Sequence, residues 1–192
     1  MSSFVGFTAL VIAVVSWTIA PTIVSRASLK EKIDALAFNG WRMLVALLAT
    51  LPLAVLVEGF PHSTPWLDAE FQAGVWVGGV VGSIVGDSLF IYSVARVGAS
   101  VALPASYLFI LWTSLYDYYA GIAGSRILIG AILAILGVIV VARSGGGRRG
   151  GDIHGIIAAV LASLVWAASM YAYQLALAKA GISVWLGLEH CS

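Results

Sequence analysis

Two side chains of opposite charge stand alone inside long apolar stretches of the sequence. Asp87 is the one charged residue in "VVGSIVGDSLFIYSVA" (Val80–Ala95), and Arg42 is the one charged residue in "FNGWRMLVALL" (Phe38–Leu48). A charge near the centre of a membrane costs about 2.5–3.5 kcal/mol on insertion scales, so such residues usually pair or face a wet cavity. Arg42 and Asp87 are therefore candidates for an ion pair, a substrate site or a proton site.

The composition of the chain indicates that these stretches lie in a membrane. Of the 192 residues, 61% are hydrophobic and 10% are charged, whereas a soluble domain has about 45–50% apolar and about 25% charged residues. The net charge of +1 gives no reason to expect a nucleic-acid partner. The single cysteine, Cys191, excludes a disulfide framework. The expected surroundings are a lipid bilayer, in the cell membrane.

Six apolar segments are long enough, or nearly so, to cross a bilayer core, which needs about 20 residues per helix. Because membrane strands alternate apolar and polar residues, these continuous apolar runs favour helices. The predicted spans are about Phe4–Val24, Ala35–Val57, Gln72–Val94, Gly98–Tyr119, Ile127–Ala142 and Gly155–Ala178. The fold class predicted is all-α, a polytopic (multi-pass) integral membrane helical bundle.

Basic residues predict the orientation of this bundle. The first, third and fifth loops contain Arg26, Lys30, Lys32, Arg96, Arg143, Arg148 and Arg149. The other loops and the C-terminal segment contain Arg126 and Lys179. Since cytoplasmic loops carry an excess of Lys and Arg, we expect the first, third and fifth loops in the cytoplasm and the N-terminus outside.

A segment near the N-terminus recurs late in the chain. "GFTALVIAVVSW" (Gly6–Trp17) is similar to "GIIAAVLASLVW" (Gly155–Trp166), with the glycine and the tryptophan at the same places. Five predicted helices separate the copies, so the second enters the membrane from the opposite side, as in the inverted repeats of secondary transporters. We expect residues 1–150 to form a five-helix repeat and residues 151–192 to hold the first helix of a second repeat and a short tail. Chance similarity of two small-residue helices is the alternative.

The depths of the two charges predict a contact between them. Arg42 lies four residues before the centre of its predicted helix, and Asp87 four residues after the centre of the next. Because consecutive helices are antiparallel and rise about 1.5 Å per residue, both charges lie about 6 Å from the midplane on the same side. Pairing would relieve the desolvation of each. Asn39 shares a helix face with Arg42, and Ser83 shares one with Asp87. A structural ion pair and a substrate or proton site are both open.

Aromatic residues and a proline complete the candidate site. Trp17 and Trp166 lie deep in their helices and are candidate cavity walls. Pro104 should kink its helix and free backbone groups. Either Pro104 lines a cavity together with Ser106 and Tyr107, or the kink is purely structural. The candidate substrate-binding residues are Arg42, Asp87, Asn39, Ser83, Trp17 and Tyr107. We expect no catalytic residue and no metal site.

The chain resembles the EamA-like family of the drug/metabolite transporter superfamily. The resemblance is carried by the glycine and tryptophan that open each repeat, by Phe38–Leu48, by "SVARVGASVALPASY" (Ser93–Tyr107) and by "GAILAILGVIVVARS" (Gly130–Ser144). It implies a ten-helix exporter or importer of small metabolites, built from two five-helix halves, in which Arg42 is more often structural. The sequence departs from this pattern because the second half stops after about one helix. We therefore expect a chain truncated after the sixth helix.

Function is expected to follow from this resemblance. The leading hypothesis is a secondary-active permease of small metabolites, or a fragment of one. The alternative is a non-transporting helical membrane subunit that needs a partner, either a second copy in a homodimer or a separately encoded second half. The face awaiting that partner is expected to include Ala13, Ser16, Gly82, Ser83, Gly86 and Asp87. No nucleotide-binding motif is present, so transport is expected to be coupled to an ion gradient or to the substrate alone. No cofactor is expected.

An enzyme is a weaker alternative. Intramembrane aspartyl proteases use two carboxylates that share a proton across facing helices, in Tyr-Asp and Gly-x-Gly-Asp motifs. Here the pairs Tyr116–Asp117 and Gly86–Asp87 come in the reversed order, and Ile84 replaces the first glycine. Asp117 is also expected near the opposite membrane surface from Asp87. The chain is therefore expected not to be an enzyme.

Overall fold

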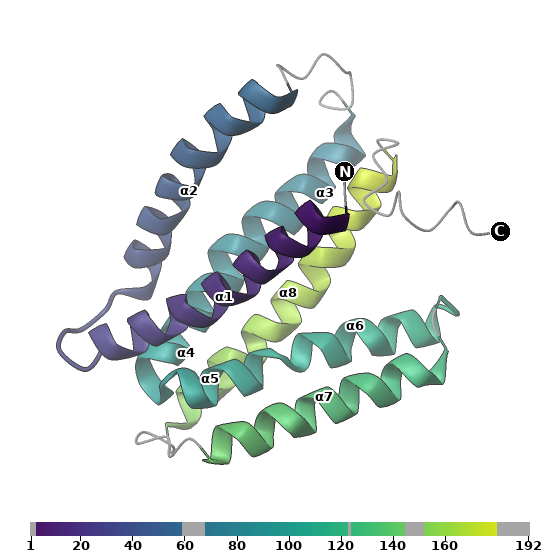
Figure 1. The fold of residues 1–192 in the computed structure, drawn as a ribbon. Coiled ribbons are helices and arrows are strands. Elements are labelled where there is room, and N and C mark those ends of the chain that lie inside the picture. Colours follow the sequence, from purple (N-terminus) through teal and green to yellow (C-terminus); the bar gives the residue numbers. More distant parts are fainter. Residues whose placement is uncertain (1–2, 59–67, 123, 145–151, 180–192) are drawn as a thin grey trace.

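The computed structural model describes residues 3–58, 68–122, 124–144 and 152–179, and these form helices joined by short turns (Figure 1). The elements are α1 (Ser3–Ala27), α2 (Ala35–Glu58), α3 (Ala69–Val75), η2 (Trp76–Gly86), α4 (Asp87–Val97), α5 (Ala99–Ser106), α6 (Leu108–Tyr119), α7 (Ser125–Ser144) and α8 (Ile153–Lys179). Within the described ranges no strand occurs. The basic linker around Arg148 and Arg149, the tail after Lys179 and the side chain of Ala13 lie outside what is described.

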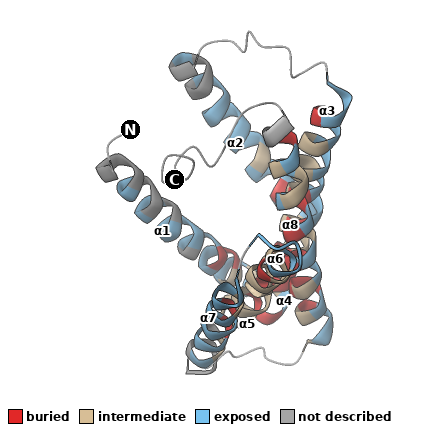
Figure 2. Cartoon of the chain, turned by 90° about the vertical axis from the view of Figure 1, so that its right-hand side faces the viewer, coloured by how far each residue is buried: buried red, intermediate tan, exposed pale blue. Residues whose placement is uncertain are grey.

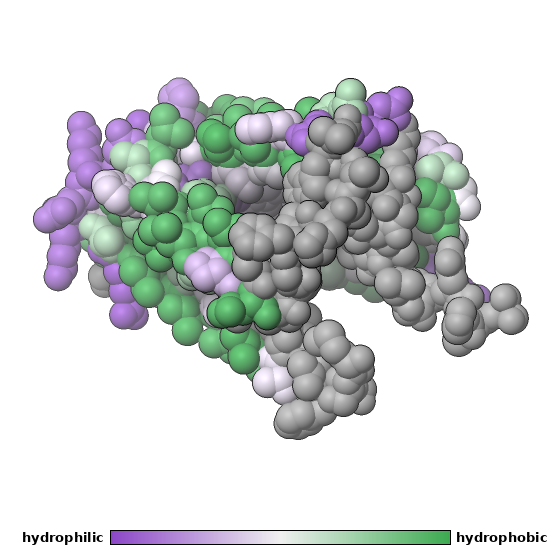
Figure 3. All heavy atoms as spheres, turned by 90° about the horizontal axis from the view of Figure 1, so that it is seen from above, coloured by the Kyte–Doolittle hydropathy of each residue, from purple (hydrophilic) through white to green (hydrophobic). Residues whose placement is uncertain are grey.

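Every one of the six predicted spans coincides with a helical segment. Four stretches of the described residues are long and apolar enough to cross a membrane, and α7 contributes a shorter apolar helix over Ser125–Gly137. The four are Ala35–Pro52, Ala69–Val97, Ala99–Tyr119 and Ile153–Ala176. Hydrophobic side chains also form broad areas on the outside of the bundle (Figure 3). The all-α, polytopic membrane bundle is confirmed.

Helix α8 forms the centre of the packing. It contacts α3, η2, α4, α5 and α6, and the buried residues gather along these elements, whereas α1 and α2 are mostly exposed (Figure 2). The main buried cluster joins four elements through Val24, Phe90, Ile91, Val94, Val97, Ala102 and Ala162. Figure 1 shows α1 and α8 running in opposite directions, as equivalent helices of inverted repeats must.

A row of four glycines allows α8 to approach α3 and η2 closely. Gly74, Gly78, Gly82 and Gly86 all face α8, and a Cβ built on Gly78 would lie 2.6 Å from Cβ of Tyr173. Small residues at membrane helix interfaces let backbones come together in this way. Gly82 and Gly86 are therefore buried inside the chain. The expectation that these two residues lie on a face open to a partner is wrong, because α8 already covers them.

The third helical segment changes its winding before the candidate site. Residues Trp76–Gly86 form a π-helix, and ordinary α-helix resumes at Asp87. A π-helix is rare and often marks a functional site. Asp87 is the first residue after this change in winding.

The fourth segment is interrupted near its proline. Helix α5 ends at Ser106 and α6 begins at Leu108, with Tyr107 between them. Pro104, inside α5, cannot donate a backbone hydrogen bond, while the Ser106 hydroxyl donates to the carbonyl oxygen of Leu103 at 2.9 Å. The irregularity expected near Pro104 is thus a one-residue turn at Tyr107, whose backbone N–H still donates to the carbonyl oxygen of Leu103 at 3.0 Å.

The ends of several helices meet on one side of the bundle. Arg96 Nη1 lies 3.0 Å from Asp152 Oδ2, and Asp152 also accepts the backbone N–H of His154 at 3.0 Å, which caps α8. Desolvation raises the pKa of Asp152, but hydrogen bonds from Arg96 and from the backbone N–H groups of Gly155 and His154 outweigh it and hold that pKa below its ordinary value. These contacts bring the third and fifth loops to the same side.

Candidate functional site

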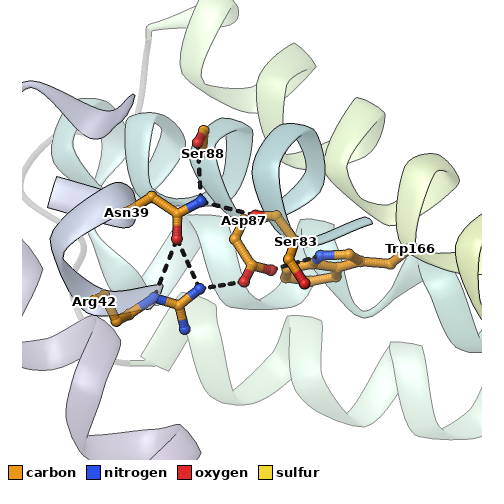
Figure 4. A network of polar contacts seen from close by, with 6 residues as sticks. All are labelled: Asn39, Arg42, Ser83, Asp87, Ser88 and Trp166. Atoms are coloured by element: carbon orange, nitrogen blue, oxygen red, sulfur yellow. Dashed lines mark hydrogen bonds and ion pairs between the residues drawn. The ribbon is translucent and has the colours of Figure 1, made fainter. Parts of the chain in front are cut away.

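Arg42 and Asp87 form an ion pair between α2 and the start of α4. Nη2 of Arg42 donates a hydrogen bond to Oδ2 of Asp87 (Figure 4). The Asp87 side chain is 15% exposed and that of Arg42 is 40% exposed, so the carboxylate is the more enclosed partner. The contact predicted from the equal depth of the two residues is confirmed.

Asn39 holds the arginine in place and joins α2 to the π-helix. Its Oδ1 accepts hydrogen bonds from Nε and Nη2 of Arg42, at 3.2 and 2.8 Å. Its Nδ2 donates to the carbonyl oxygen of Ser83 at 2.7 Å and to the hydroxyl of Ser88 at 3.0 Å (Figure 4). Asn39 is 2% exposed, and its amide uses both its donor and its acceptor. Asn39 therefore fixes the orientation of the Arg42 side chain and does not itself border a cavity.

Trp166 of α8 holds the other oxygen of the carboxylate. Its indole Nε1 donates to Oδ1 of Asp87 at 2.8 Å (Figure 4). Because Oδ2 accepts from Arg42, each carboxylate oxygen has its own donor, on a different helix. Both oxygens of the Asp87 carboxylate therefore have a hydrogen-bond donor within otherwise apolar surroundings.

Aromatic rings surround this polar cluster. Trp17 and Trp166, the two tryptophans of the sequence repeat, lie edge to face with ring centroids 5.7 Å apart. Phe90 stacks on Trp17 at 6.0 Å and contacts Trp166 at 5.3 Å. Phe109 meets Trp166 edge to face at 6.4 Å. The two tryptophans that match in the predicted sequence repeat thus touch one another, although the described parts of the helices that carry them, α1 and α8, do not pack backbone to backbone.

A large cavity opens between α1, η2, α5, α6 and α8. Its volume is about 750 Å³, within the range of about 300–1,000 Å³ typical of small-molecule sites. The lining residues are Val14, Trp17, Gly78, Gly79, Gly82, Ser83, Asp87, Ser106, Tyr107, Phe109, Trp166, Ser169, Met170 and Tyr173. Asp87 is the one charged residue among these described residues.

A smaller cavity lies on the other side of the carboxylate, between α1, α2 and α4. It measures about 290 Å³ and is lined by Ala20, Pro21, Ile23, Val24, Phe38, Phe90, Ile91, Val94, Trp17, Arg42 and Asp87. Trp17 and Asp87 line both cavities. Asp87 therefore stands at the boundary between two hollow spaces, with Arg42 on the smaller side.

The structure brings the six candidate residues together unevenly. Trp17, Ser83, Asp87 and Tyr107 line the large cavity, and Arg42 lines the small one, while Asn39 supports Arg42. Sequence reasoning considered Trp166 as a cavity wall but missed its bond to Asp87, and it missed Ser88 altogether. The predicted repeat offered one signal, because Trp166 aligns with Trp17 in it.

Asp117 belongs to a separate cluster at the far end of α6. The Tyr171 hydroxyl lies 3.0 Å from Asp117 Oδ1 and 2.8 Å from the carbonyl oxygen of Thr113, and the Tyr171 ring packs on Tyr116 at 4.1 Å. Asp87 accepts hydrogen bonds from Arg42 and Trp166 instead. Within the described part of the chain no three His, Cys, Asp or Glu residues gather where they could hold a metal ion.

Comparison with known proteins gives one match. The family model described as the EamA-like transporter family matches residues 4–143, which run from the second residue of α1 to the last but one of α7. No curated protein and no solved structure gives a significant match to the chain.

Proposed function

The chain belongs to the EamA-like transporter family, and on this basis we propose that it is a secondary-active carrier of small metabolites, or part of one, whose substrate site is the 750 Å³ cavity. Family members are transporters and not enzymes, and the apolar helices make this a multi-pass membrane protein. The cell membrane, with the first, third and fifth loops in the cytoplasm, is the location we propose from the basic residues.

The observation that carries this proposal is the position of Asp87. A membrane-embedded carboxylate is costly and by default suggests a functional site, and this one lies at the boundary of two cavities. Ser83 and the aromatic residues Trp17 and Tyr107 line the large cavity together with it. A mostly apolar cavity with a few polar groups is the usual form of a small-molecule site.

The two cavities suggest how access alternates. Trp17, Phe90 and Trp166 form an aromatic partition, and Trp17 lines both spaces. Because α1 and α2 are largely exposed, we propose that they move against α4 and α8, opening the small cavity as the large one closes. In repeat transporters such rocking occurs around a site at the repeat interface. The proposed repeats are residues 1–150 and a second that begins at 151, with α1 and α8 equivalent.

Transport by purified protein in vesicles tests the proposal. The chain alone is expected to transport poorly, because alternating access rocks one repeat against the other. With a second copy or a separate second half present, saturable uptake from a panel of amines, amino acids, organic acids and sugars is expected for at least one compound class, and Asp87→Asn should abolish it. Arg96→Gln, which changes a charge away from both cavities, is the matched control. If correctly inserted, folded chain gives no saturable uptake either alone or with a second copy or second half, the transporter proposal is wrong and a non-transporting helical subunit is favoured.

A further inference from the structure

We infer that the large cavity binds an amphipathic organic monocation, whose charged group contacts Asp87 and whose apolar body lies among the aromatic rings. Only the statement that this ligand is the transported substrate rests on the proposed function. Binding of the ligand can be measured without transport.

The charge distribution of the large cavity favours a cation. Among its described lining residues Asp87 carries the one charge, and no Lys or Arg is present to receive an anion. Arg42 lines the smaller cavity and contacts Asp87 through Oδ2. A ligand in the large cavity therefore reaches the carboxylate without crossing the guanidinium. An anionic ligand there would face the carboxylate directly.

The aromatic lining supports the same ligand class. Trp17, Tyr107, Phe109, Trp166 and Tyr173 all border the cavity. Ring faces attract ammonium and quaternary ammonium groups, more strongly when water is excluded, and a few such rings around one carboxylate form a cation site. The remaining lining is mainly apolar, with serines, so the rest of the ligand is expected to be hydrophobic or weakly polar.

Arg42 acts in this arrangement as a built-in competitor for Asp87. In the empty site the guanidinium neutralises the carboxylate, so that no uncompensated charge is left in apolar surroundings. When a cationic ligand takes its place, Arg42 keeps a second acceptor, because Asn39 Oδ1 already accepts from its Nε and Nη2. The exchange replaces one positive charge beside Asp87 by another, and it leaves Arg42, whose side chain is 40% exposed, bonded to the neutral Asn39 alone.

This competition makes the effect of removing Arg42 diagnostic. In Arg42→Gln the carboxylate keeps its bond from Trp166 but loses its internal cation, so it should bind an external cation more tightly. If Arg42 instead received an anionic group of the substrate, the same variant would weaken binding. The two ligand classes therefore predict opposite signs.

The test uses three probes of similar size with the purified full chain in detergent, and equilibrium dialysis as the readout. The probes are benzyltrimethylammonium, benzyl alcohol and phenylacetate, which are cationic, neutral and anionic. We expect saturable binding of the cation, at least about tenfold tighter than of the other two. Arg42→Gln should tighten cation binding by about tenfold or more, Asp87→Asn should abolish it, and Arg96→Gln should leave it unchanged.

Several results would overturn the inference. They are preferential binding of phenylacetate or benzyl alcohol, or weaker cation binding by a folded Arg42→Gln variant. Circular dichroism and size-exclusion chromatography report folding. If the Arg42→Gln variant does not fold, the relative affinities of the three probes for the unaltered chain decide whether the cavity prefers a cation. Cation binding without saturable uptake in vesicles refutes the transporter proposal alone, whereas uptake of neutral or anionic compounds without cation binding refutes this inference alone.

Discussion

The indole of Trp166 donates a 2.8 Å hydrogen bond to Oδ1 of Asp87, and so ties α8 to the first residue of α4. Arg42 approaches the same carboxylate from α2. The Asp87 side chain therefore connects α4 to both α2 and α8, which are far apart in the sequence. Loss of the carboxylate should loosen contacts on both sides of it.

The Arg42–Asp87 pair should show energetic coupling. Asp87→Asn alone leaves the guanidinium without its counter-charge and should lower the free energy of unfolding by about 1–3 kcal/mol. Adding Arg42→Gln should recover part of that loss, with a coupling energy of about 0.5–3 kcal/mol. Thermal unfolding in detergent of the two single variants and the double variant measures it. Strictly additive losses would show that the pair does not interact.

Trp166→Phe should separate the indole bond from the ring packing. The variant keeps an aromatic ring beside Trp17 and Phe90 but removes the donor to Asp87. A hydrogen bond to a charged group contributes about 1.5–3 kcal/mol, so the unfolding midpoint should fall clearly. Trp17→Phe is the control, because it occupies the equivalent repeat position and its indole is not bonded to Asp87. Equal losses in the two variants would refute a role for the indole bond.

Two neighbouring glycines should respond differently to alanine. A Cβ at Gly78 would lie 2.6 Å from Cβ of Tyr173 and 2.8 Å from the carbonyl oxygen of Ser169, whereas a Cβ at Gly79 would have nothing within 4 Å. Gly78→Ala should destabilise by about 1–3 kcal/mol through overpacking. Gly79→Ala should be neutral or stabilising by up to about 1 kcal/mol. Comparable midpoints for both variants would mean that α8 does not lie against the glycine row.

The contact between Arg96 and Asp152 should make stability depend on pH at the acid end. Because the pKa of Asp152 is lower in the folded chain than its ordinary value of 3.8, the carboxylate contributes stability that is present above that value. This contribution is lost as the pH falls through the lower, folded pKa. Unfolding midpoints measured from neutral pH down to about pH 3 should fall at the acid end.

Asp152→Asn is the informative variant for this measurement. Asparagine remains a good N-cap, so α8 keeps its cap while the ion pair with Arg96 is lost. Part of the acid-end decrease should therefore disappear, and Arg96→Gln should remove a similar part. An unchanged pH profile in both variants would contradict the role given to Asp152.

The sequence predicted the depth of residues better than the direction of their side chains. The positions of Arg42 and Asp87 along their helices were enough to predict the contact, since depth follows directly from residue count. The faces turned towards neighbours were harder to predict, because a helix that is apolar all round has no amphipathic face to define its rotation. For this reason the burial of Gly82 and Gly86 was mispredicted, and the Trp166 partner was missed.

The π-helix could not be predicted for a related reason. Nothing in "WVGGVVGSIVG" (Trp76–Gly86) distinguishes a five-residue from a four-residue hydrogen-bonding pattern, because glycine and valine occur in both. The amide of Asn39, which donates to the carbonyl oxygen of Ser83 inside this segment, comes from another helix. Such a tertiary contact has no signal in the local sequence.

The glycine row has a consequence for the order of events during synthesis. The groove that Gly74, Gly78, Gly82 and Gly86 form is filled by α8, and α8 leaves the ribosome after α4, α5, α6 and α7. At about 5–20 residues per second, this interval lasts on the order of several seconds. Until then the groove is open to lipid or to the insertion machinery. The contact of α3 and η2 with α8 is thus the last helix–helix contact of the described bundle to form. An insertase that shields small-residue grooves would act at this stage.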